Sequence, residues 1–419
     1  MRYSLFHPDL SHLHPRFLLN PAARHTSKIY QDLWSTRPHT RVGYDQDKIL
    51  RKFVTMDSLK QRWRGDLTSK PHIGVVGAGL AGLRCADILI QNGFKVTIIE
   101  ARNRVGGRLH QEVLPNGHLA DVGPNWIHGT NDNPMLDLAK QTNTAISDWE
   151  STSCVFNESG ELLSLKDGEK YSTIVWDIIQ DAFKHSNSNS SDIDSKESLH
   201  DFFAQKVTER VPDTEADHER IRSIVYINFP KPYWLGKEGD DRKAEGFVQW
   251  LSPNYVPDLN PRRWNQEVVE LASLDPEVSH PTLLFYTYGE QSQYITSELL
   301  KISDPQKKDE FLLNFFKPYY SRLPHYSESN PDCKPSGFMA TDWLHDELSG
   351  FGSYSNFQVG LEEGDADIRT MREGLPDHGL WLAGEHTAPF VGLGTATGAY
   401  WSGEAVGKRI AEAYYGRSK

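Results

Sequence analysis

The chain has 419 residues, 38% of them hydrophobic, which is enough to bury a large core and more natural for two domains than for one. Its 11 Trp, 17 Tyr and 18 Phe favour a folded enzyme over a disordered chain. The formal net charge of −12 argues against a nucleic-acid partner, which would need a basic patch, and favours small cationic partners. No apolar run approaches the roughly 18 residues of a membrane span.

The three cysteines, Cys85, Cys154 and Cys333, are far apart and lack CxxC spacing. They predict neither a disulfide framework nor a zinc site, so no metal centre is expected. A reducing compartment is the natural setting for such a chain, and we expect a cytoplasmic location.

The first 55 residues are rich in His, Pro and Arg and poor in acids. Metal binding and mitochondrial targeting are both open interpretations of this composition. The five histidines up to His39 lack regular ligand spacing, however, and no apolar signal core is present. A flexible extension over residues 1–70 is therefore the preferred interpretation.

Residues 72–100 predict a strand, a helix and a second strand in that order. The apolar strand Ile73–Val76 leads through a glycine-rich turn into the helix Leu80–Gln91, which Gly93 ends. The second strand, Lys95–Ile99, follows at once. This order is typical of the first half of a Rossmann-like α/β domain.

The glycine-rich turn has the pattern GxGxxG, with Gly77, Gly79 and Gly82. Gly77 permits the tight turn, Gly79 lets the backbone approach a pyrophosphate at the helix N-terminus, and Gly82 lets the helix pack closely on the strands. Glu100, at the end of the second strand, lies where an acid accepts hydrogen bonds from an adenosine ribose. A glycine-rich turn in another kind of α/β protein is the alternative.

The next residues decide against that alternative. The acid is followed by Arg102, by Gly106, Gly107 and Arg108, and then by DVGPNWIHG over residues 121–129. This order resembles the flavin amine oxidase family, which includes monoamine oxidases, polyamine oxidases and lysine-specific histone demethylases. The resemblance implies FAD as the cofactor, with backbone close to its pyrophosphate at the two glycines and positive charge from the last arginine.

The C-terminus carries the second half of the resemblance. A strand is expected over Leu380–Ala383, with Gly384 and Glu385 at its end and a helix from about Gly398. The resemblance implies that this turn meets the ribityl chain and pyrophosphate of FAD, so one dinucleotide domain is built from both ends of the chain. One face of the helix is expected to carry Val406, Ile410 and Tyr414.

Four more residues are placed at the site by the resemblance. Thr395 falls where many relatives have a tyrosine of an aromatic cage, and Ala396 follows it at the cofactor turn. Trp343 resembles the tryptophan that precedes the C-terminal flavin motif. His128 matches a position at which polyamine oxidases often present His or Glu near the substrate, with a structural histidine as the alternative. The expected catalytic residues are therefore His128, Trp343 and Thr395, and non-covalent FAD is expected because no cysteine lies near residues 392–398.

The expected organisation has four parts. The N-terminal extension (1–70) precedes the first part of the FAD-binding domain (71–150), a mixed α+β substrate-side domain (151–340) and the second part of the FAD-binding domain (341–419). The polar run Ser186–Ser195 predicts a surface loop within the third part.

The middle of the chain is short for this family. Arg210–Arg222 shows no apolar strand series, so a block that would cover the adenine is expected to be missing there. Counting back from Phe229 places Ile224 where the family has a lysine that holds a water at the flavin. A shortened product with little turnover is therefore an alternative to an active enzyme.

The expected function is oxidation of amines, with polyamines and related secondary amines as the leading class. The resemblance implies hydride transfer to flavin N5 and reoxidation by O2 to give H2O2. A catalytically silent flavoprotein is one alternative. A histone-lysine demethylase is another, and only Thr395 suggests it.

Overall fold

The computed structural model describes residues 70–128, 133–146, 153–189, 202, 205–206, 222–237, 242–355, 364–389 and 392–416. These residues form two compact units, each assembled from separate stretches of the chain. Unit 1 contains the described residues within 111–128 and 139–353, and unit 2 contains those within 70–110, 133–138 and 354–416. The expected N-terminal extension lies outside the described residues except for Lys70.

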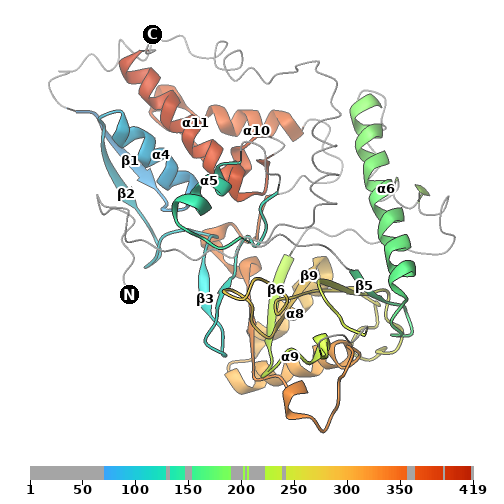
Figure 1. Cartoon of the computed structure of the whole chain (residues 1–419). Helices are drawn as coiled ribbons and strands as arrows, with labels where there is room; N and C mark the ends of the chain where they lie inside the picture. The colour runs from blue at the N-terminus through green and yellow to red at the C-terminus, as the bar shows by residue number, and fades with distance from the viewer. Residues whose placement is uncertain are drawn as a thin grey trace. The chain divides into compact units, whose positions relative to one another are not determined.

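Unit 2 begins with the predicted strand, helix and strand (Figure 1). β1 (His72–Val76) leads into α4 (Leu80–Gln91) and then β2 (Lys95–Ile99). The two strands pair in parallel over their whole length, which confirms the expected βαβ unit. Gly93 adopts a φ of 83°, a backbone conformation that suits the residue ending this helix.

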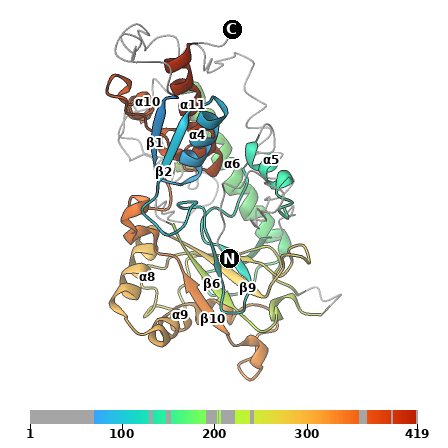
Figure 2. The same ribbon diagram turned by 90° about the vertical axis from the view of Figure 1, so that its left-hand side faces the viewer.

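A long C-terminal helix, α11 (Ala396–Tyr415), packs along α4, as both views of the molecule show (Figures 1 and 2). Glycine allows the close approach, because a Cβ on Gly403 would lie 2.1 Å from the backbone oxygen of Ala81. The expected apolar face is found, with Val406 and Ile410 buried against α4. The described part of this unit also contains α10 (Gly364–Glu373).

The strand expected at Leu380–Ala383 is not formed. Only the isolated bridge between Leu375 and Leu380 is present there, closing a short turn on itself. Within the described residues β1 pairs with β2 and with no other strand, so Leu380–Ala383 has no neighbour to complete its hydrogen bonds. The alternation is nevertheless strand-like, because Trp381 packs on the unit 2 core while Leu382 is exposed.

Unit 1 is built on a six-stranded sheet. From one edge to the other it contains β10 (Gly337–Ala340), β6 (Arg222–Asn228), β9 (Thr282–Tyr288), β8 (Gln266–Glu270), β7 (Phe247–Trp250) and β5 (Ser153–Phe156). All neighbouring strands are antiparallel except β5 and β7. Successive residues of β9 are buried on opposite faces, so the sheet is covered on both sides.

Different elements cover the two faces. Helices α8 (Gly289–Lys301) and α9 (Pro305–Tyr320) bury one face in an aromatic core. The hairpin of β3 (Gln111–Val113) and β4 (Leu119–Asp121) lies in the cluster on the other face.

The other regular elements among the described residues are α5 (Pro134–Gln141), α6 (Leu165–Asn189) and the 3₁₀ turns Tyr233–Leu235, Pro331–Cys333, Trp343–His345, Glu347–Ser349, Pro376–His378 and Glu385–Thr387.

Two details of the middle differ from, or extend, the expectations. The loop predicted at Ser186–Ser195 is wrong at its start, because α6 continues to Asn189, and Ser190–Ser195 lie outside the described residues. Ile224, at the position of the expected lysine, is 7% exposed and lies in the apolar cluster of β6. In the described part of the chain no helix is long and apolar enough to cross a membrane.

Candidate functional site

The start of α4 offers backbone donors to an anion. Its N-cap is Gly79, which has no side chain to cap the helix, and no acidic residue lies in the first turn. The first helical hydrogen bond runs from the N–H of Leu83 to the oxygen of Gly79. Helix geometry leaves the preceding N–H groups without helical acceptors, and the helix dipole favours negative charge at this end. A pyrophosphate therefore fits here.

The two glycine-rich segments meet at this helix start. Gly79 and Gly106 form a parallel backbone bridge, and the N–H of Gly106 donates to the oxygen of Ala78 at 2.8 Å. Gly106 and Gly107 have φ values of 102° and 63°, which few other residues adopt. A Cβ on Gly107 would lie 3.4 Å from the Cα of Gly79. The result is a surface of bare backbone that fits the close approach of a cofactor phosphate.

Gly79 and Gly82 serve different needs within the motif. A Cβ on Gly82 would lie 2.2 Å from the backbone oxygen of Gly77, so this glycine lets the helix pack against the turn. In the described part of the chain a Cβ on Gly79 would meet no atom within 4 Å, and its φ of −73° is open to any residue. The described residues therefore give no steric reason for glycine at position 79, whereas a ligand that approached the backbone would give one.

Glu100 lies next to these turns. We call the start of α4 at Gly79, the turn at Gly106 and Gly107, and Glu100 the cradle. The Glu100 carboxylate accepts hydrogen bonds from the backbone N–H of Ala78 at 2.6 Å and of Arg102 at 2.8 Å. Partial burial raises the pKa of the carboxyl, but the hydrogen bonds from these backbone groups outweigh it, so the pKa lies below its ordinary value. The group is thus an ionised acceptor at neutral pH, as contact with ribose hydroxyls requires.

Glu385 joins three segments of unit 2. One oxygen of its buried carboxylate pairs with Arg108 at 2.9 Å and accepts from the backbone N–H and hydroxyl of Ser355. The other accepts from the N–H of Gly394 at 2.8 Å. The expected residues Arg108 and Glu385 are therefore brought together, with Gly384 directly before the carboxylate, and Ser355 and Gly394 were not foreseen.

Thr395 is the N-cap of α11. Its hydroxyl accepts from the N–H of Gly398 at 2.9 Å and donates to the oxygen of Gly392 at 2.8 Å, and Ala396 is the first residue of the helix. Asn133 adds a contact that sequence analysis missed, since its side-chain oxygen caps α5 and accepts from Thr397. An Asn before Pro-Met-Leu, which is a typical cap sequence, could have signalled this.

The remaining expected residues, His128 and Trp343, belong to unit 1. Trp343 is 8% exposed, and its indole N–H donates to the backbone oxygen of Val122 at 3.0 Å. It therefore holds the chain segment that follows β4. His128 is exposed and lies at the end of that segment.

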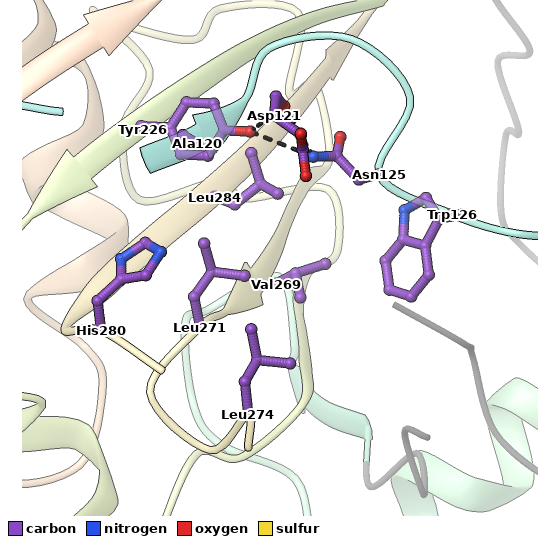
Figure 3. Close-up of a pocket in the computed structure, with 10 residues that line it drawn as sticks. All are labelled: Ala120, Asp121, Asn125, Trp126, Tyr226, Val269, Leu271, Leu274, His280 and Leu284. Atoms are coloured by element: carbon purple, nitrogen blue, oxygen red, sulfur yellow. Dashed lines mark hydrogen bonds between the residues drawn. The ribbon is translucent and has the colours of Figure 1, made fainter. Parts of the chain in front are cut away.

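A small pocket of about 30 Å³ lies beneath the same segment (Figure 3). Its polar residues include Asn125 and Tyr226, and Figure 3 shows leucine and valine side chains between the ring of His280 and the indole of Trp126. The lining consists of Ala120, Asp121, Asn125, Trp126, Tyr226, Val269, Leu271, Leu274, His280 and Leu284.

His280 is a buried polar group of this pocket. Its Nδ1 lies 2.6 Å from the hydroxyl of Thr282, while its Nε2 is buried without a hydrogen-bond partner in the described part of the chain. Burial, with a smaller contribution from His118, lowers the pKa of His280 to about 4. The ring is therefore neutral at physiological pH.

Comparison with protein-family models gives a match to a family described as flavin-containing amine oxidoreductase. The match covers residues 80–206 and 223–411, which is more than half of the chain. It begins at the first residue of α4 and includes Glu100, Gly106 and Gly107, nearly all of the sheet of unit 1 and most of α11.

Curated relatives match over shorter stretches. Probable polyamine oxidase 4 of Arabidopsis thaliana is 38% identical over 73 residues, which is 17% of this chain and 14% of that protein. Lysine-specific histone demethylase 1 homolog 1 of the same plant is 37% identical over 101 residues, 23% of this chain and 12% of that protein. The matched stretches thus span only a small part of either relative.

Solved structures with a similar fold include putrescine oxidase. A variant of that enzyme has a TM-score of 0.53 at 13% sequence identity, covering 82% of this chain and 100% of the other. The wild-type enzyme bound to putrescine has a TM-score of 0.52 at 14% identity, covering 81% and 99%. At this identity the likeness shows the fold, which agrees with the expected α/β architecture.

Proposed function

We propose that this chain, which belongs to the flavin-containing amine oxidoreductase family, is an FAD-dependent oxidase of polyamines or related secondary amines. The observation that carries the proposal is the cradle at the start of α4. There the uncapped helix end, the paired glycine turns and the ionised Glu100 fit the anionic and ribose parts of one dinucleotide.

Residues of unit 2 would hold the cofactor. The N–H groups at the start of α4 would donate to the pyrophosphate, and Glu100 would accept from the adenosine ribose. Arg108 is held by Glu385 and would add positive charge near the phosphates. Bound FAD supplies the redox chemistry of the family, which is acceptance of a hydride from the carbon beside the amine nitrogen and reoxidation by O2.

Residues of the segment that ends at His128 would bind the amine. We assign His128 as the polar side chain that contacts the amine. Trp126 and Phe247 would be aromatic side chains that exclude water from it. Desolvation favours the neutral amine, whose lone pair the reaction needs. The acidic balance of the chain and the similarity to a polyamine oxidase favour polycationic amines over neutral ones.

A silent flavoprotein is the second candidate function. The resemblance places a lysine at position 224, where a buried isoleucine pairs with Tyr286 across the sheet. No cationic side chain can hold a water from that position. The candidate predicts FAD binding without reduction by amines.

The test is release of H2O2 by the FAD-loaded protein with spermine, spermidine, their acetylated forms, putrescine, aryl amines and a methylated lysine peptide. Turnover of aliphatic polyamines supports the proposal, and turnover of the methylated peptide alone would favour the demethylase reading. Anaerobic mixing with each amine separates the candidates, because bleaching of the flavin absorbance counts against a silent protein. A yellow protein that no amine reduces would refute the oxidase proposal.

A further inference from the structure

The segment that links β4 to His128 has no helix or strand of its own. Residues 122–128 follow the strand Leu119–Asp121 as bends and irregular chain, with an isolated β-bridge at Trp126. Such a segment keeps one shape only if side chains from other elements bind it. Here Trp343 binds the start of the segment at Val122, and the binding groups nearer His128 come from the sheet of unit 1.

Two tyrosines on neighbouring strands face this segment. Tyr226 lies on β6 and Tyr286 on β9, and the strand register pairs Tyr226 with Leu284 and Ile224 with Tyr286. The tyrosines are therefore two residues apart in register and lie on the same face of the sheet. Both belong to the buried cluster on the face opposite α8 and α9.

Their hydroxyls bind Asp121 at the end of β4 and two residues of the segment, Asn125 and Trp126. Tyr226 donates to the backbone oxygen of Asp121 at 2.6 Å and accepts from the Asn125 side-chain amide at 3.3 Å. Tyr286 donates to the Asn125 side-chain oxygen at 3.2 Å and accepts from the Trp126 indole N–H at 2.9 Å. Figure 3 shows the bonds that join Tyr226 to Asn125 and Asp121.

Donors and acceptors match throughout this network. In these bonds among the described residues each tyrosine hydroxyl acts as both donor and acceptor, and the Asn125 amide also donates to the oxygen of Asp121 at 2.8 Å. The amide orientation is therefore fixed by its partners on both sides. Burial, with a smaller effect of Tyr286, raises the pKa of Tyr226 well above its ordinary value, so its hydroxyl remains a donor. The Trp126 ring also stacks on Phe247, with ring centres 5.4 Å apart.

We propose that Tyr286 and Tyr226 are positioning residues that hold the Asn125 to His128 segment in the geometry that amine oxidation needs. The inference rests on the proposed function, in which His128 contacts the amine. Tyr286 acts through Asn125 and Trp126 and does not itself contact the substrate. Loss of its hydroxyl removes two hydrogen bonds that hold the segment shortly before His128, one to Asn125 and one from Trp126.

The experiment compares Tyr286→Phe with the wild type as full-length, FAD-loaded protein. The aromatic ring remains, so the flavin absorbance and the FAD dissociation constant should not change. The ¹⁵N-indole resonance of Trp126, identified by its loss in Trp126→Phe, should shift, and its hydrogen exchange should become faster. With the best amine found for the wild type, kcat should fall on the order of 10- to 100-fold, which is typical of a misplaced catalytic segment.

Tyr319→Phe is the matched control. It removes another buried tyrosine hydroxyl, which accepts from Asn260 in the core on the opposite face, and should leave kcat unchanged. Trp126→Phe deletes the same hydrogen bond from its other end while keeping a ring on Phe247, so the double variant with Tyr286→Phe should be no slower than the slower single variant. If Tyr286→Phe does not fold, Tyr226→Phe and Trp126→Phe give the same comparison.

The outcomes separate this inference from the proposed function. Unchanged kcat in Tyr286→Phe, with an active wild type, would overturn the positioning role. An unchanged Trp126 indole resonance would overturn it even if the wild type oxidises no amine. If the wild type oxidises no amine but the Trp126 indole resonance shifts in Tyr286→Phe, the oxidase proposal alone would be refuted.

Discussion

Gly79 and Gly82 differ at the level of single atoms, and the difference gives a selective test of the cofactor site. Gly79→Ala should leave the thermal stability of the flavin-free protein unchanged, because the new methyl group meets no atom of the described residues within 4 Å. It should weaken FAD binding at least about tenfold, since the methyl occupies the space through which phosphate reaches the backbone. Flavin fluorescence quenching measures the dissociation constant.

Gly82→Ala is the control for this variant. Its methyl group would lie 2.2 Å from the oxygen of Gly77, so it should lower the free energy of unfolding of the flavin-free protein by about 1–3 kcal/mol. Equal FAD affinity in Gly79→Ala and the wild type would show that the start of α4 does not bind the cofactor.

His280 gives a prediction about pH. Its pKa in the folded protein is lowered to about 4 from the ordinary value of 6.5, so between these values the unfolded chain binds a proton that the native state does not. Stability should therefore fall as pH drops from 6.5 toward 4, by up to about 3 kcal/mol from this 3% exposed side chain. Above pH 6.5 the group should contribute no pH dependence.

His280→Leu removes this titration and suits the apolar pocket. Urea unfolding at pH 6.5 and 4.5 should show a smaller loss of stability in the variant than in the wild type. His118→Leu changes the exposed ring that stacks on His280 and serves as the comparison. Equal losses in the wild type and His280→Leu would rule out the neutral buried imidazole.

Residues whose role is set by local backbone geometry could be predicted from the sequence. Gly77, Gly82 and Glu100 follow from the spacing of one strand, one turn and one helix. Tyr226 and Tyr286 could not be foreseen, because their hydrogen bonds join residues 105 and 161 positions apart in the chain. His280 could not be foreseen, because its lowered pKa depends on its burial in the folded protein. Glu385 was foreseen from the family motif, but its link to Ser355 and Gly394 depends on the folded loop.

At the scale of elements, prediction succeeded where a segment supplies its own partners. α4 begins and ends at the predicted residues because the periodicity and glycines lie within it. Leu380–Ala383 has the alternation of a strand but failed to form one, because a strand depends on a neighbour elsewhere in the chain. The order of the six strands of unit 1 could not be predicted from the sequence either, because it also depends on pairing between distant segments.

The two-stranded sheet of unit 2 has one poorly covered face. Val76 is 86% exposed and Ile99 is 58% exposed, whereas Val75 packs on the core beside α4 and α11. Val76→Thr should keep the strand, change stability by less than about 0.5 kcal/mol and reduce binding of a hydrophobic dye. Val75→Thr places a hydroxyl in the packed face and should cost about 1–3 kcal/mol.

Dye fluorescence and thermal unfolding of the two variants decide this prediction. A large loss of stability in Val76→Thr would mean that another part of the protein covers this face. Unchanged dye binding would mean that the exposed apolar surface lies elsewhere.

At the scale of the whole molecule, the cofactor site depends on segments from both ends of the chain. Arg108 and Glu385 are paired although 277 positions separate them. The described part of unit 2 contains only the sheet of β1 and β2. The stretch Arg210–Arg222, where a block was expected to be missing, lies outside the described residues except for Arg222, which begins β6. Among the described residues of unit 2, the packing of α4 on α11 is the main contact between regular elements that holds its two ends together.

We therefore expect FAD to contribute a large share of the stability of unit 2. The cradle needs both glycine turns in place, so FAD should bind the folded state and not the unfolded one. Free FAD at 100 times its dissociation constant should add about 2.7 kcal/mol to the free energy of unfolding, and the melting temperature should rise with FAD concentration. The protein as purified should carry less than one FAD per chain. Gly79→Ala provides the control, because its melting temperature should respond to FAD only at much higher concentration. A monodisperse, fully loaded wild type whose melting temperature is insensitive to added FAD would show that the short middle of the chain already closes the site.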